Sequence, residues 1–489
     1  MLPDLPVEIW LHIASLLPRG HVHKLAGINW MLYSLAMDET YQEVQFVDDG
    51  KDMLKTLRQL EYPGISSRVK HLYIRPGFFP KMVKPVLGME MLGRLRWKAK
   101  LPRLSLKPRE DNILSIAQRV LANCSETEQL SIVLYDLHPP PAFDDFLKTM
   151  WYSLGPHIRR LTIDATLAKF PLILQHTLSG VLPNLTELHI NLAVSRVFTT
   201  HKQELSAVGS IMYFANTLSD TLQSLTISSS EMNDINFLFT TFRSLPHLQK
   251  LAVPTLMSNS VHPRALTQFL TRHKATLRHF SFGSSEVAGP WAEPGIPYQE
   301  WAMQGFCELE LPALKSLRIR ILRHYWTNDV VTLPLSSARL PQLVSLTLLD
   351  TYMLCDELKT LFGSVFQGNR LESLQLRVKE LGSEVLNTLA MTLPNLTDLD
   401  ITFKYRSVWN ALICDSEALR DLDFEKQMMN CHYPNWMIRN LRLSQVHQYS
   451  CAQSHPHLRT MNIVARCLPF PVRLHIENDC TCSDRPLLC

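Results

Sequence analysis

Cysteines near the C-terminal end are the side chains of this sequence that come nearest to a metal-ligand pattern. Cys480 and Cys482 form a C-x-C pair, Cys467 lies upstream, and Cys489 is the last residue. Thiolates bind zinc, but structural zinc sites space their cysteines as C-x-x-C knuckles or follow them with an ordered histidine pair. Neither pattern is present. We therefore expect residues 479–489 to form a reduced, frayed tail, and we expect no bound metal.

The usual catalytic and nucleotide-binding motifs are also absent from the sequence. It contains no P-loop, no Rossmann glycine fingerprint, no H-E-x-x-H helix and no G-x-S-x-G elbow. Histidines and cysteines are scattered at unrelated phases, which is typical of structural or surface roles. The sequence therefore predicts a protein that is not an enzyme and that needs no cofactor.

Charged residues at strand spacing point to binding instead of catalysis. Acidic side chains flank apolar ones at Asp398 and Asp400, and again at Asp421, Asp423 and Glu425. Alternate residues of a strand share one face, so adjacent strands would bring these carboxylates together. Like charges at that distance raise one another's pKa unless a cation lies between them. Basic residues hold the same strand positions in earlier repeats: Arg318, Arg320 and Arg377.

This acidic surface, beside the basic one, is predicted to bind a basic segment of a target protein. The alternative is a solvated sheet face whose charges only keep it soluble. The sequence leaves both interpretations open.

A short sequence motif, Leu-x-x-Leu-x-Ile, recurs along the chain and positions these charges; we call each copy a phrase. Residues 183–190 and 393–401 carry it most clearly. Most steps between copies are roughly 20 to 37 residues, which falls in and just beyond the leucine-rich-repeat period. The middle apolar position of each copy is Leu72, Leu161, Leu188, Leu225, Leu251, Phe280, Leu317, Leu346, Leu374, Leu399, Leu422, Leu441 or Met461, with a weaker copy at Leu130.

Amphipathic segments between these phrases predict helices, so the fold class is α/β. Strand and helix of each repeat would close one layer, and stacked layers would bury a continuous core. We expect residues 111–478 to form a leucine-rich-repeat solenoid, with a parallel concave sheet backed by helices. The expected helices are 51–60, 111–123, 142–154, 205–218, 263–274, 355–366 and 383–393.

Residues 76–110 interrupt the repeats and are strongly basic. Such a run could contact a phosphate backbone, but Trp97 is its one aromatic residue near the charges. An exposed, partly disordered insertion is the favoured interpretation, and nucleic acid is not expected as a partner. Residues 47–110 are thus assigned to a linker helix, the first repeat and this insertion. A second irregular stretch, 283–312, is predicted to form a loop over the concave surface.

Length, net charge and hydropathy exclude few classes of protein. The 489 residues carry a formal net charge of +4, which is too small to indicate a particular partner. No stretch approaches the roughly 18 uninterrupted apolar residues of a membrane span. The N-terminus lacks a basic leader. We expect an intracellular protein, cytoplasmic or nuclear, with no membrane partner.

The N-terminal residues predict two or three short amphipathic helices. The first begins at the Leu5-Pro6 pair and ends before Pro18, with Glu8 near its positive end. Helices this small bury too little surface to fold alone, so they pack on a partner or on the repeats. The apolar faces contain Ile9, Ile13, Leu16 and Leu17 in the first helix, and Leu25, Ile28, Leu32 and Leu35 after the Arg19-Gly20 break.

Residues 2–46 resemble the F-box motif, and residues 1–46 are assigned to an F-box-like helical domain. The match departs from the family at residues 20–23 and at Asn29-Trp30. The repeats look like the irregular, helix-backed repeats of fungal F-box leucine-rich-repeat proteins. The resemblance rests on Leu5, Pro6, Glu8, Ile9, Ile13, Leu16, Leu17, Leu25, Ile28 and the Leu32/Leu35 pair.

This resemblance implies that the N-terminal helices bind the Skp-type adaptor of a cullin-based SCF ubiquitin ligase. The repeats would then hold an unidentified protein substrate. The alternative is a leucine-rich-repeat scaffold whose N-terminal helices only seal the first repeat, because solenoids need a terminal cap.

Overall fold

A computed structural model describes residues 5–18, 20–47, 50–78, 110–135, 140–177, 180–193, 201–229, 236–254, 264–283, 306, 308–320, 338–363, 370–406, 424–445, 456–468 and 473–474. The chain forms two compact units. The first comprises Met1–Glu231 and Thr241–His247, and the second comprises Met232–Thr240 and Leu248–Cys489.

In its described part, the first unit contains a sheet of six parallel strands, whose order in the sheet is their order in the chain. The predicted phrases pair residue for residue, since Leu72 faces Leu130, Leu130 faces Leu161, and the alignment continues through Leu188 to Leu225. The strands are β1 (Glu43–Phe46), β2 (His71–Ile74), β3 (Gln129–Leu134), β4 (Arg160–Thr166), β5 (Glu187–Ala193) and β6 (Ser224–Ser229).

The described strands of the second unit follow the same rule. Leu251, Phe280 and Leu317 align across the first three of them, and the alignment continues to Leu441. The strands are β7 (Lys250–Pro254), β8 (His279–Gly283), β9 (Ser316–Arg320), β10 (Ser345–Met353), β11 (Ser373–Leu381), β12 (Asp398–Arg406), β13 (Asn440–Gln445) and β14 (Arg473–Leu474).

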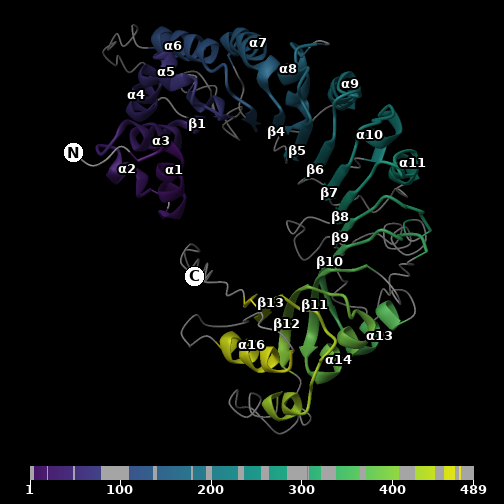
Figure 1. Ribbon diagram of the computed structural model, residues 1–489. Helices are drawn as coiled ribbons and strands as arrows, with labels where there is room; N and C mark the ends of the chain where they lie inside the picture. Colours follow the sequence, from purple (N-terminus) through teal and green to yellow (C-terminus); the bar gives the residue numbers. More distant parts are fainter. Residues whose placement is uncertain are drawn as a thin grey trace, which may run out of the picture. The chain divides into compact units, whose positions relative to one another are not determined.

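Helices lie along one face of each sheet. Figure 1 shows α6 to α9 on one side of the strands in the first unit, and α13 and α14 beside β10 to β12 in the second. The helices of the first unit are α1 (Val7–Leu16), α2 (Val22–Leu25), α3 (Trp30–Tyr41), α4 (Lys51–Leu60), α5 (Pro63–Ser66), α6 (Glu110–Asn123), α7 (Ala142–Leu154), α8 (Phe170–Leu174) and α9 (His201–Thr217). Those of the second are α11 (Arg264–Arg272), α13 (Cys355–Gly363), α14 (Ser383–Thr392) and α16 (Pro456–Arg466), while α10 (Asn236–Thr241) spans the boundary. Short 3-10 turns occur at Pro76–Phe78, Gly155–His157 and Leu167–Lys169.

The core lies between the sheet and these helices. Along β5 the residues alternate between buried and half-buried, as expected when one face of a strand is covered. The buried indole of Trp151 on α7 donates to the carbonyl of Ile173 at 2.9 Å, so its polar group is satisfied inside the core. We call the uncovered side of each sheet its open face. These observations establish a leucine-rich-repeat-like α/β fold in each unit.

A repeated backbone pattern joins one repeat to the next at the strand entries. The carbonyl of Glu128 accepts from the N–H groups of Arg159, at 2.8 Å, and Arg160, at 3.0 Å. The carbonyl of Gln42 likewise accepts from Lys70 and His71. Strand β1 is therefore the first member of the same stack, although the sequence pattern did not predict a strand there.

One predicted strand is wrong. Met461 lies inside α16, where Met461 and Val464 are buried at helical spacing. The strand that follows β13 in the sheet is β14. Short apolar runs fit both a helix and a strand template, so the phrase alone does not separate them. The phrase at Leu422 lies outside the described residues, as do most of the basic segment 76–110, most of 283–312 and the whole tail 479–489.

Candidate functional site

The first helix, α1, is an apolar helix with no buried residue. It follows Pro6, whose extended backbone provides the cap position, and it carries Glu8 in its first turn. Ile9 is 45% exposed and Leu16 is 72% exposed. Apolar residues at helical spacing gather on one face of a helix, so α1 presents an apolar surface that is not buried among the described residues. Apolar side chains that stay in water forgo the favourable free energy of burial.

The residues predicted to bind an adaptor fall into two groups in the structure. Six are exposed: five belong to α1 and the residues just before it, and the sixth, Ile28, lies between α2 and α3. The five are Leu5, Pro6, Glu8, Ile9 and Leu16. Three are half-buried where the short helices meet: Ile13, Leu17 and Leu25. Both α1 and α2 contact α3, so the structure brings these residues onto one small helical body.

Helix α3 ties this body to the first repeat. It begins at Asn29, whose side chain accepts from the Leu32 N–H at 2.8 Å, which is a common way to start a helix. Leu32, Ala36 and Tyr41 are buried, and α3 contacts β1 and α5. The sealing of the first repeat is thus performed by α3, and α1 takes no buried part in it.

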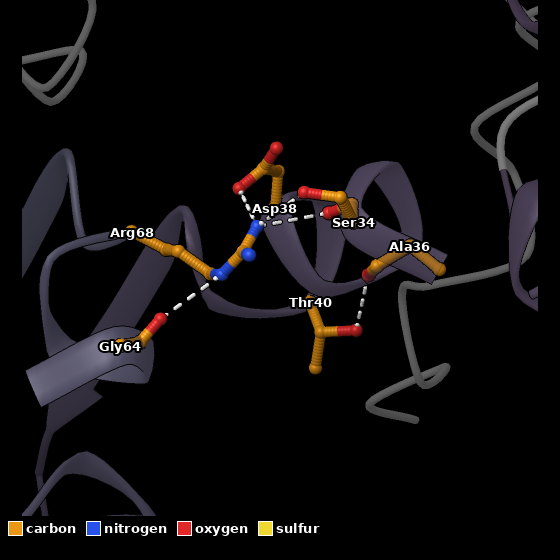
Figure 2. A network of polar contacts seen from close by, with 6 residues as sticks. All are labelled: Ser34, Ala36, Asp38, Thr40, Gly64 and Arg68. Carbon is orange, nitrogen blue, oxygen red and sulfur yellow. Dashed lines mark hydrogen bonds and ion pairs between the residues drawn. The ribbon is translucent and has the colours of Figure 1, made fainter. Parts of the chain in front are cut away.

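Arg68 fixes α3 to the turn that leads into β2 (Figure 2). Its guanidinium donates to the carbonyl of Ser34 at 3.0 Å and to the hydroxyl of Ser34 at 3.1 Å. It also pairs with Asp38 on α3 and donates to the carbonyl of Gly64 on α5 at 3.1 Å. One side chain therefore cross-links two helices through a planar fork of donors.

The turn between α1 and α2 is held by Glu39 of α3. Gly20 has φ of +79°, a conformation that glycine adopts without strain, and its N–H donates to the Glu39 carboxylate at 2.9 Å. His23 lies 3.5 Å from the same carboxylate. In the first turn of α3, Trp30 is 73% exposed and Tyr33 is 50% exposed. These two aromatic residues were not among the predicted contact residues, although Asn29 as a helix cap signals that Trp30 opens a helix at the surface.

The open face of the first unit carries a row of hydrogen-bonded side chains across four strands. Tyr135 donates to Asp164 at 2.6 Å, Asn191 donates to the same carboxylate at 2.9 Å, and Ser228 donates to Asn191 at 2.9 Å. Burial and then the hydrogen bond to Asp164 raise the pKa of Tyr135 to about 12. Sequence reasoning missed this row, because it arises only when the four strands are neighbours.

A second row on the same face is an ion pair with a neighbouring amide. The guanidinium of Arg160 on β4 donates twice to Glu187 on β5, at 2.7 and 3.0 Å, and the Gln129 side-chain oxygen lies 3.4 Å away. The hydrogen bond to Glu187 raises the pKa of Arg160. Arg160 and Glu187 thus neutralise each other, whereas the described partners of Asp164 are the uncharged Tyr135 and Asn191.

On the open face of the second unit, the predicted acidic surface does not form as expected. Strand β12 pairs directly with β13, so Asp400 faces Arg442 and Gln375 instead of a second aspartate. Gln375 donates to Asp400 at 3.0 Å, and Arg442 lies 4.0 Å from the same carboxylate. Asp398 accepts from Thr397 at 2.6 Å and from Asn440. The expectation that two aspartate pairs lie on adjacent strands is therefore wrong, because the strands that pair with β12 are β11 and β13.

The remaining predicted target-binding residues are dispersed. Residues 424–429 are helical, so Glu425 does not lie on a strand and that part of the prediction is wrong. Asp421, Asp423 and the side chain of Arg320 lie outside the described residues. Arg318 is exposed on β9. Whether these residues contact a target stays a prediction.

Arg377 is the member of that set with a distinctive environment. A shift in register between Thr347 and Tyr352 brings Tyr352 opposite Arg377. The guanidinium carbon of Arg377 lies 5.9 Å from the centre of the Tyr352 ring, and the Lys404 ammonium lies 4.3 Å from it. Cations over an aromatic face are attracted by its electron-rich centre. Tyr352 and Lys404 were missed by sequence reasoning, because a bulge decides which residues become neighbours.

The described residues hold no cluster of three or more His, Cys, Asp or Glu side chains placed to bind a metal ion. Within the described ranges, no helix combines the length and the hydropathy needed to cross a lipid bilayer.

Comparisons with known proteins add little. No family profile matches the chain, and no curated protein matches it. Among solved structures, the chain is similar to the crystal structure of the Rad7 and Elc1 complex in yeast, at 12% sequence identity and a TM-score of 0.26. That match covers 70% of this chain and 86% of the other. At such a TM-score the likeness carries no argument about function.

Proposed function

We propose that the chain is the substrate-recruiting subunit of an SCF-type ubiquitin ligase, with α1 and its neighbours binding the Skp-type adaptor. The observation that carries this proposal is α1, whose apolar residues are exposed at the positions where the sequence resembles the F-box. Within α1, Ile9 is 45% exposed and Leu16 is 72% exposed, and Leu5 just before the helix is 38% exposed. An apolar surface of this kind on a small helical body is typical of a docking site.

The role of α3 supports this assignment over a purely structural cap. A cap buries its apolar face against the first repeat, as α3 does through Leu32, Ala36 and Tyr41. Helix α1 adds no buried side chain to that contact. The apolar residues of α1 therefore contribute little to the stability of the chain alone. Their burial against a partner would be favourable in free energy.

The second part of the proposed function, binding of the target protein, is assigned to the repeats. Side chains on the open faces vary freely without disturbing the buried phrases, so the same fold serves different targets. Ubiquitin transfer would be performed by other subunits on the cullin scaffold, so no catalytic residue is expected in this chain.

Co-purification with a Skp-type adaptor tests the proposal. The full chain is expected to retain the adaptor, and the double variant Leu5→Ala with Ile9→Ala is expected to lose it. Tyr152→Ala is the matched control, because Tyr152 is 86% exposed on α7, away from the N-terminal helices. Equal retention by the double variant and the control would exclude this adaptor surface.

Point substitutions test the site more sharply than a deletion of residues 1–46. Such a deletion removes β1, whose Val44 and Phe46 are buried and pair with β2. Loss of binding would then reflect a damaged first repeat.

The alternative function is a leucine-rich-repeat scaffold without ligase activity. It has the same fold and predicts no adaptor in the purified complex under any condition. A chain that captures a target but never the adaptor would favour this alternative.

A further inference from the structure

The strand entries of β7, β8 and β9 concentrate positive charge in the second unit. Lys250 is the first residue of β7, and Arg278 and Lys315 directly precede β8 and β9. Arg318 lies on β9, opposite Ser281 of β8. All four cations are exposed. We call Lys250, Arg278, Lys315 and Arg318 the entry cluster.

Backbone contacts and one imidazole place these cations close together. The carbonyl of Arg278 accepts from the Lys315 N–H at 2.8 Å, so the two residues are neighbours on adjacent strands. Lys250 faces His279 across β7 and β8. Burial lowers the pKa of His279, and the nearby positive charges of Lys250 and of the two entry residues lower it further. Neighbouring strands are about 4.8 Å apart, so the entry cluster spreads its charge over roughly 10 Å.

No carboxylate among the described residues neutralises the entry cluster. Its four cations form no ion pair and no side-chain hydrogen bond within the described part of the chain. Glu308 and Glu310 precede the turn into β9, yet neither is paired with them. Glu372 directly precedes β11, and β10 separates it from β9. The charge of the cluster therefore stays uncompensated in this part of the chain.

Along the open face, the residues next to the entry cluster are uncharged. The β10 residues in its two rows are Ser345 and Thr347. The same rows reach aspartates, Asp398 and Asp400, on β12. Asp350 lies farther along β10, beyond the strand entry. Two strands, β10 and β11, thus separate the cluster from the aspartates of its rows.

Like charges on adjacent strands repel each other, so the entry cluster makes the free chain less stable. A bound polyanion would replace this repulsion by attraction between opposite charges. Exposed charges also speed the approach of an oppositely charged partner. The cluster is therefore suited to an anionic ligand whose charge spans a similar width.

The backbone N–H groups at these strand entries are already occupied. Those of Arg278 and His279 donate to the carbonyl of Gln249, and those of Lys315 and Ser316 donate to the carbonyl of Arg278. A compact phosphate site normally draws on backbone N–H groups as well as on side chains. Carboxylates spread along a peptide need only the side-chain cations. The entry cluster therefore favours carboxylates over a single phosphate.

The neighbouring positions also disfavour a nucleic acid. Ala252 and Ser281 form the next row on β7 and β8, and Thr347 continues it on β10. None of these three side chains has a ring on which a base could stack.

We propose that the entry cluster binds an acidic segment of the target protein, formed by consecutive Asp or Glu residues. Several carboxylates along one segment spread negative charge over a width similar to that of the four cations, and each cation can donate to a carboxylate. This inference rests on the target-binding part of the proposed function and names the chemical class of the segment that is bound.

Fluorescence anisotropy of the full chain with a labelled hexaglutamate peptide tests this inference. Binding is expected to weaken with added salt, because the contacts are between exposed charges. Arg278→Gln with Lys315→Gln is expected to lower the affinity about fivefold or more. Lys148→Gln with Arg439→Gln is the matched control. It removes the same two charges from exposed positions on α7 and before β13, and it should keep the parent affinity.

Comparison of the two double variants separates the entry cluster from other basic regions. Residues 76–110 could also attract the peptide, and this contribution would be the same in both variants. Equal affinities of the two variants would therefore overturn the inference. A charge-reversed variant, Arg278→Glu with Lys315→Glu, is expected to bind hexaglutamate more weakly still and to bind hexalysine more tightly than the parent chain does. A reversed variant that keeps the parent's preference would also overturn it.

Two further ligands test the chemical class. A phosphoserine hexapeptide whose binding depends on the entry cluster, where that of hexaglutamate does not, would overturn the assignment to carboxylates. A single-stranded oligothymidylate that binds more tightly than hexaglutamate, and that the double Gln variant of the cluster no longer binds, would overturn it in favour of a nucleic acid.

Melting temperature and adaptor capture complete the controls. The substituted side chains are exposed, so Arg278→Gln with Lys315→Gln should melt at the parent temperature or above it. If it melts lower, Lys250→Gln alone is measured, and an affinity equal to that of the parent would count against the cluster. Adaptor capture by each variant should persist. Absence of the adaptor from every preparation would refute the proposed ligase role and leave the peptide measurement valid.

Discussion

Helices α1 and α7 have the same local signals and opposite environments. Each follows a proline and carries acidic residues in its first turn, and each has apolar residues at helical spacing. Along α1 no residue is buried. Along α7 six are buried: Phe143, Phe146, Leu147, Met150, Trp151 and Leu154. The comparison teaches that an apolar helical face predicts a contact, and that the neighbouring elements decide whether the chain itself supplies it.

The largest effect is expected from a substitution in the buried face of α7, which tests the contrast with α1 most directly. Trp151→Ala leaves a large cavity and an unpaired carbonyl at Ile173, so the free energy of unfolding is expected to fall by about 3–5 kcal/mol. Denaturant unfolding measures the change. The neighbouring Tyr152→Ala alters an exposed ring and should change it by less than about 0.5 kcal/mol. A similar loss in both variants would show that α7 is not packed as described.

A medium effect is expected at the link between α3 and the first repeat. Arg68→Ala removes the donors to Ser34, Asp38 and Gly64, and its side chain is only 21% exposed. Stability should fall by roughly 1–2 kcal/mol, and cleavage of the N-terminal helices by protease should become faster.

Arg119 supplies the control for that experiment. Its ion pair with Glu61 is at the surface, with the arginine side chain 58% exposed, so Arg119→Ala should cost less than about 1 kcal/mol. Unchanged proteolysis of the Arg68 variant would argue against its role as a cross-link.

The smallest effect on stability is expected in α1. Leu16→Ala truncates a side chain that is 72% exposed, so the free energy of unfolding should change by less than about 0.5 kcal/mol. The same substitution at the buried Leu147 of α7 should cost about 2–5 kcal/mol. Equal losses at the two positions would mean that α1 is covered within the chain, and would remove the observation on which adaptor binding rests.

Much of the fold could be predicted, because it depends on patterns that are local and repeated. The phrase around Leu188 aligns with those at Leu161 and Leu225 in the sheet, and helices α4 and α7 have the predicted bounds. Each such position is buried for the same reason in every repeat. The error at Met461 has the same origin, because its apolar spacing also satisfies a helix.

The candidate sites were predictable only in part. Exposure of Ile9 and Leu16 depends on which elements pack against α1, and no local pattern reports that. The arrangement of charged side chains on the open face of the second unit depends on which strands are adjacent in the sheet. Asp400 was expected beside another aspartate and lies beside Arg442, and Tyr352 reached Arg377 through a bulge.

The sequence by itself determined that strands and helices alternate and which residues of each strand are buried, because burial of apolar side chains follows the period of the backbone. Only the tertiary structure decided which strands lie side by side, and therefore which charges meet. It also decided that, in the described part of the chain, α3 buries side chains at the first repeat while α1 buries none. These outcomes depend on contacts between residues far apart in the chain, and the spacing of residues along the sequence carries no record of them.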